Sequence, residues 1–281
     1  MARRPDPHHF GRRRWATTRA GFVLGAVVAT TLLGLNLLDL PGSHHRWGPA
    51  ATWVTDVSDR PTPRAAPQPG PIGTPLPPPA RSGPHEFMAT QHDTDQPVAY
   101  DPCRPIPIVV NELRAPSGST QLLRNSLDRM GEITGFSFEV EGTSSEVPEL
   151  PRPAYQPERY GDRWAPVLVM WADEHDVPEL AGVAGLGGSS IAQAPGSSTA
   201  VFVSGVVVLH GPSFDQLLSS SRGWLAAEGV ILHELGHLLG LDHVDDPNEL
   251  MYHGVSMRDD FGVGDLTGLA TLSSGPCVPE I

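Results

Sequence analysis

The residues best suited to chemistry lie within one run of eleven near the C-terminus: His233, Glu234, His237 and His243. Two histidines four residues apart on a helix project from the same face, so both imidazoles can bind one zinc ion. A third ligand at His243 can reach that ion only if the helix ends before it. Gly240 permits this, because glycine tolerates the left-handed backbone that commonly ends helices.

Three neutral nitrogen ligands leave one tetrahedral position for water, which is the arrangement of a catalytic rather than a structural zinc. Glu234 follows the first ligand directly and lies near that position, where it can accept a proton from the water. The alternative is a solvated helix with incidental histidines. The apolar character of the segment argues against it, because buried imidazoles need partners for their nitrogens. The apolar residues are Val230, Ile231, Leu235, Leu238 and Leu239.

The motif resembles that of the metzincin metallopeptidases, whose long signature ends in a methionine-containing turn beneath the zinc. Met251 follows His243 by eight residues, close to the spacing of the matrixin branch. The resemblance covers roughly residues 98–281 and implies an α+β, zincin-like fold with a twisted mixed β-sheet, an active-site helix and a C-terminal helix. There are two departures: His253 and Gly254 stand where matrixins usually have a proline, and no cysteine-switch motif is visible.

This resemblance implies a zinc metalloendopeptidase in which one Zn²⁺ is bound by His233, His237 and His243. Glu234 is the expected general base, and the expected substrates are extracytoplasmic proteins or peptides. The alternative is a membrane-tethered binding module that keeps the zinc fold and cleaves nothing. Additional structural Zn²⁺ or Ca²⁺ has no support in the sequence, since isolated loop histidines are usually surface residues. The histidines concerned are His175, His210 and His253.

Hydrophobic patterns predict the elements that must position these residues. A helix is expected from Ser119, as its N-cap, to Gly135, and the zinc helix over residues 223–239. Asp265 is expected to cap a final helix. The Gly- and Ser-rich stretch 181–198 predicts loops and a short edge strand near the cleft, to which an extended substrate could add as a strand. The other predicted strands span residues 105–113, 136–140, 167–171 and 201–209.

The net charge of the chain changes sign near residue 20. The first 19 residues carry +5 of the total −13, so residues 20–281 carry −18, which disfavours nucleic acid as a partner. Residues 20–38 are uncharged and long enough to span a bilayer. We therefore expect a basic cytoplasmic tail (1–19) and a transmembrane signal anchor (20–40), with a monomeric catalytic ectodomain outside the cell membrane. A cleaved signal peptide and a secreted protein are the alternative.

Residues 41–97 hold 13 of the 30 prolines and few apolar residues, so they predict a Pro-rich disordered linker. A propeptide removed on maturation fits the same composition. The matrixin-like domain is expected over residues 98–281. Cys103 and Cys277 lie near its two ends, and an extracytoplasmic location favours a disulfide between them.

Overall fold

The computed structural model describes residues 53–54, 61, 68–92, 94–147, 149–193, 198–220, 223–254 and 258–281. All of these belong to the second of the two units into which the chain divides, Leu37–Ile281. The predicted cytoplasmic tail (1–19) and transmembrane segment (20–40) lie outside the described residues. Within the ranges given above, no helix has both the length and the apolar character that crossing a membrane requires.

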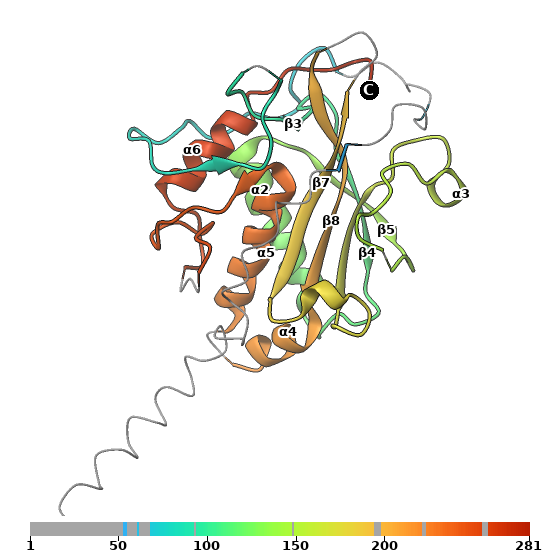
Figure 1. The fold of residues 1–281 in the computed structure, drawn as a ribbon. Coiled ribbons are helices and arrows are strands. Elements are labelled where there is room, and N and C mark those ends of the chain that lie inside the picture. Colours follow the sequence, from blue (N-terminus) through green and yellow to red (C-terminus); the bar gives the residue numbers. More distant parts are fainter. Residues whose placement is uncertain are drawn as a thin grey trace, which may run out of the picture. The chain divides into compact units, whose positions relative to one another are not determined.

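One mostly parallel sheet organises the described residues (Figure 1). Its strands follow the order β1-β7-β8-β6-β4-β5, and β3 also pairs with β8. Every pairing is parallel except that of β7 with β8, so the predicted mixed sheet is confirmed. The strands are β1 (Trp53–Val54), β3 (Ala99–Tyr100), β4 (Ile106–Asn111), β5 (Phe138–Thr143), β6 (Val167–Ala172), β7 (Gly185–Gln193) and β8 (Ala200–His210). A second, two-stranded sheet pairs β2 (Glu86–Phe87) with β9 (Leu241–Asp242).

Two long helices, α2 (Ser119–Thr134) and α5 (Gly223–Leu239), pack on the same side of the main sheet (Figure 1). Helix α2 ends at Gly135, which has a φ of 71°, as predicted. Its N-cap is Gly118 and not Ser119, whose buried hydroxyl donates to the carbonyl of Pro116 instead. The remaining helices are α3 (Pro157–Tyr160), the 3-10 helix η1 (Pro178–Leu180), α4 (Gly211–Leu218) and α6 (Val263–Leu272).

The core lies between the sheet and these two helices. Strand β6 is buried along its whole length, which explains why its sequence is a continuous apolar run. Leu123 and Leu127 lie four residues apart on α2. They face the same core as Leu235 and Leu238 of α5. Residues 234–239 of α5 are buried on every side of the helix, so this packing fixes how α5 lies on the sheet.

Part of the predicted linker contacts the domain. Backbone amides of Gln68 and Ile72 donate to the carbonyls of Cys103 and Pro102, at 3.2 and 3.0 Å, and β2 joins the small sheet. The predicted disulfide between Cys103 and Cys277 is present. The described part of residues 41–97 therefore includes stretches with specific backbone partners, although its composition is that of a tether.

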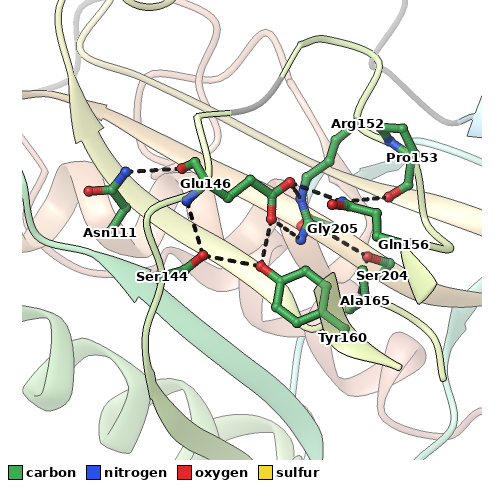
Figure 2. Close-up of polar contacts among 10 residues, drawn as sticks. All are labelled: Asn111, Ser144, Glu146, Arg152, Pro153, Gln156, Tyr160, Ala165, Ser204 and Gly205. Carbon is green, nitrogen blue, oxygen red and sulfur yellow. Dashed lines mark hydrogen bonds and ion pairs between the residues drawn. The ribbon is translucent and has the colours of Figure 1, made fainter. Parts of the chain in front are cut away.

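A buried ion pair anchors the long connection between β5 and β6 (Figure 2). The Arg152 guanidinium donates two hydrogen bonds to the carboxylate of Glu146, at 2.8 and 3.0 Å, and both side chains are at most 5% exposed. Tyr160 donates to the same carboxylate at 2.6 Å. Arg152 also donates to the hydroxyl of Ser204 and the carbonyl of Gly205 on β8, at 3.0 and 3.1 Å. The connection is thereby fixed against the middle of the sheet.

Candidate metal centre

The three predicted histidine ligands converge. His233 and His237 lie one turn apart on α5, and Gly240, with a φ of 116°, turns the chain back toward them. Each pair of Nε2 atoms in the triad is 3.1 Å apart, including both pairs with His243. Nitrogen ligands of one tetrahedral zinc are separated by about 3.3 to 3.4 Å. The triad therefore fits a single ion within a few tenths of an ångström.

The outer ring nitrogens fix which tautomer faces the centre. His233 Nδ1 lies 2.8 Å from the carbonyl oxygen of Leu250, and His237 Nδ1 lies 2.8 Å from that of Leu241. A carbonyl oxygen can only accept, so both Nδ1 atoms must carry the proton. The Nε2 atoms then present their lone pairs to the shared centre, which is the usual arrangement at metal-ligating histidines.

Burial keeps the three imidazoles neutral. Loss of solvation lowers the pKa of His233 and lowers that of His237 further, with the neighbouring histidines adding to the effect. For His243 the same causes, burial first, lower the pKa to about 3. Neutral imidazole is the form that binds metal.

Glu234 lies beside the triad in an apolar setting. Its side chain is 3% exposed, and Oε2 has no hydrogen-bond partner among the described residues. Burial raises the pKa of this carboxyl to about 8. A carboxyl whose pKa lies near neutrality can both take and return a proton.

Strand β7 lies against this glutamate because it carries glycines there. A Cβ atom at Gly185 would lie 2.7 Å from Cγ of Glu234, and one at Gly187 would lie 2.3 Å from the Glu234 carbonyl oxygen. Two residues further on, the Ser189 hydroxyl donates to the carbonyl of Leu238 at 2.7 Å. The Gly-rich sequence thus permits the close approach of β7 to α5.

Met251 packs against the ligand-bearing helix beside Gly236. It is 1% exposed, and its sulfur would be 2.7 Å from a Cβ atom at Gly236, so that glycine leaves room for it. The Val244 amide donates to the Met251 carbonyl at 3.0 Å, which closes the turn after the third ligand.

Asp265 holds the Met251 turn, a role that sequence reasoning missed. We expected it to cap the last helix. It does accept from the amide of Gly262, the N-cap of α6, at 2.8 Å. Its buried carboxylate also accepts from the amides of Leu250, at 2.6 Å, and Met251, at 3.3 Å. Since the Leu250 carbonyl orients His233, Asp265 acts on the triad through two hydrogen bonds.

A second missed contribution comes from the predicted linker. In the small sheet Glu86 pairs with Asp242 and Phe87 with Leu241, and the Met88 amide donates to the Gly240 carbonyl at 2.9 Å. Strand β9 is the segment between the second and third ligands, so its pairing with β2 fixes the backbone that leads to His243. The proline-free stretch 85–96 permits a strand there, but nothing in the sequence identifies β9 as its partner.

Within the described residues, the other histidines considered above, His175, His210 and His253, do not join the triad. His210 Nδ1 lies 2.6 Å from the Ser213 hydroxyl, and its Nε2 is 3.3 Å from a carboxylate oxygen of Glu174. His253 Nε2 is 2.8 Å from a carboxylate oxygen of Asp245. In the part of the chain that the structure describes, the other group of three potential ligands contains the disulfide-bonded cysteines.

The α+β fold with its mostly parallel sheet fits a zincin-like domain, and the histidine triad is compatible with the metzincin zinc motif. The sequence model of the family described as Matrixin matches residues 203–270, from within β8 to within α6. This confirms the predicted resemblance over the segment that holds the ligands, Glu234 and Met251. The match and the triad together support a zinc metallopeptidase in general. No curated protein matches the chain.

Proposed function

We propose that the protein is a zinc-dependent endopeptidase, with His233, His237 and His243 as metal ligands and Glu234 as general base. The convergence of the three Nε2 atoms, 3.1 Å apart, beside a buried carboxyl carries the proposal, since one oxygen of that carboxyl has no hydrogen-bond partner among the described residues. A zinc ion there would polarise the scissile carbonyl and make water a nucleophile at neutral pH.

The chain's own residues then carry out the proton transfers. Glu234 takes the proton of the attacking water and delivers it to the departing amine, a role worth roughly 10²- to 10⁴-fold in rate. Its confinement between α5 and Gly185 holds the carboxyl in one place, so little orientation is lost before each transfer. An extended peptide would add as a strand beside β7 and bring its scissile bond to this carboxyl.

The substrates we propose are extracytoplasmic proteins or peptides, reached by a monomeric domain that is tethered to the cell membrane by residues 20–40. Two observations support an oxidising location: the disulfide between Cys103 and Cys277, and the apolar run that follows six arginines. Protease treatment of intact cells should degrade the catalytic domain while an N-terminal tag survives. Protection of the whole chain would contradict this placement.

Substitution of Glu234 tests the chemistry. We expect Glu234→Gln, which keeps the shape of the side chain, to retain about one zinc per chain and to lose ~10²- to 10⁴-fold in cleavage of a denatured protein substrate. Glu228→Gln, on the same helix but partly exposed, is the matched control and should cleave normally. Undiminished cleavage by Glu234→Gln would exclude Glu234 as the base.

A binding module without catalysis is the competing proposal. It predicts zinc in the wild-type protein and no cleavage of any substrate, with or without chelator. The buried carboxyl beside the triad favours the peptidase, because a closed structural zinc site has no use for a base.

A further inference from the structure

The outer edge of β7 is paired with a strand from the chain's own N-terminal region. Strand β8 pairs along one edge of β7, and β1 pairs with two residues of the other edge. In this pairing Trp53 lies opposite Ser190 and Val54 opposite Ile191, in parallel orientation. Strand β7, which we expected to be an edge strand, is therefore the second strand of the sheet.

Strand β7, whose outer edge β1 contacts, packs with one face against the helix that carries the metal ligands. A Cβ atom at Gly187 would come within 3.1 Å of the His237 Cβ, and the Ser189 hydroxyl binds the Leu238 carbonyl. Ser190 is three residues beyond Gly187, about 10 Å along an extended strand. A peptide lying along β7 with several residues on each side of its scissile bond would need this stretch of the edge.

The sequence around β1 differs from the rest of the linker. Residues 50–60 form a stretch of eleven without proline, in a region where 13 of 57 residues are proline. The stretch contains tryptophan, valine and threonine, which favour strands, whereas proline cannot donate to a strand pairing. Strand β2 likewise lies in a proline-free stretch, residues 85–96. Both stretches therefore have the composition of short pairing segments.

We propose that the segment around Trp53–Val54 docks on the edge of β7 and competes there with peptide substrates, so that the linker restrains the activity of its own domain. This rests on the proposed function. The segment is tethered, so its effective concentration is on the order of 1 mM, and docking that is weak for a free peptide would inhibit severalfold at that concentration. The competitor acts through backbone pairing and supplies no metal ligand.

Two matched replacements in the full-length protein test the proposal. Residues 51–57 are replaced by seven Gly and Ser residues, and residues 42–48 are replaced in the same way as the control. We expect kcat/KM for a peptide substrate to rise severalfold in the first variant and to stay unchanged in the second. An equal kcat/KM in both variants would overturn the competition.

A measurement that needs no catalysis separates this proposal from the proposed function. Hydrogen exchange of the backbone amides of residues 188–193 is followed in the Glu234→Gln background, with and without the replacement of residues 51–57. Faster exchange after the replacement, by severalfold or more, shows that the segment covers β7, whether or not the protein cleaves peptides. Unchanged exchange shows that the edge is uncovered and overturns the proposal. Faster exchange with unchanged kcat/KM also overturns it, because the strand would then lie off the substrate's path.

Discussion

Gly185→Ala is expected to disable the base while leaving the metal site intact. The added Cβ would lie 2.7 Å from Cγ of Glu234 and 2.8 Å from its Oε1, whereas unstrained contacts between such atoms are about 3.5 to 4.0 Å. The atoms that must yield belong to a side chain and not to backbone. The carboxyl therefore moves by about 1 Å while α5 stays in place.

The size of the effect follows from this displacement. A misplacement of about 1 Å at a reacting group can cost ~10²-fold in rate, which corresponds to about 2.7 kcal/mol in the activation free energy. The three atoms nearest to the new methyl group all belong to the Glu234 side chain, and none to His233 or His237. The zinc content should therefore stay near one ion per chain.

Gly187→Ala should behave differently, because its Cβ would meet backbone. The Glu234 carbonyl oxygen lies 2.3 Å away and the His237 Cβ 3.1 Å away, so α5 itself must shift and a ligand with it. This variant should lose zinc affinity as well as activity. Gly70→Ala is the control, since among the described residues other than its chain neighbours no atom lies within 4 Å of its added Cβ.

The assay measures kcat/KM on a peptide substrate and the zinc content of the same samples for all three variants. Normal activity of Gly185→Ala at full zinc content would refute the assignment of Glu234 as a base held by β7. Loss of zinc in Gly185→Ala would show that the glycine supports the ligands and not the base.

Three further predictions concern stability. Asp265→Ala leaves the buried amides of the Met251 turn without an acceptor and should lower the free energy of unfolding in urea by about 3 kcal/mol, with faster zinc release. In metal-free protein, Glu234 contributes stability that is full below pH 4.5 and is lost as pH rises through about 8, because its folded pKa is raised. Glu234→Gln should abolish this loss, which is on the order of a few kcal/mol in the free energy of unfolding between pH 5 and 8. An unchanged pH dependence of the free energy of unfolding would exclude the burial of Glu234 as the cause. Reducing the bond between Cys103 and Cys277, which closes a separation of 174 residues, should cost about 5 kcal/mol in the same urea assay, and a midpoint unaffected by reductant would contradict this.

Sequence reasoning succeeded where one local rule decides the outcome. The i, i+4 spacing of His233 and His237 on an apolar helix, followed by Gly240, is enough to place two ligands on one face and to end the helix after them. The predicted zinc helix, 223–239, coincides with α5. For Asp265 the local rule was not sufficient. A carboxylate near the start of a helix indicates a cap, but its hydrogen bonds to Leu250 and Met251 depend on the tertiary structure, which brings that turn next to α6.

The sequence by itself determined the chemical set: three imidazoles and a carboxyl at spacings that a helix and a glycine turn bring together, and a pair of cysteines. The tertiary structure decided what surrounds them. Backbone pairing carries little trace in side-chain composition, so the pairing of β2 with β9 and of β1 with β7 could not be predicted from a proline-rich region. The pKa of Glu234 likewise depends on burial, which results from the packing of α5 against β7.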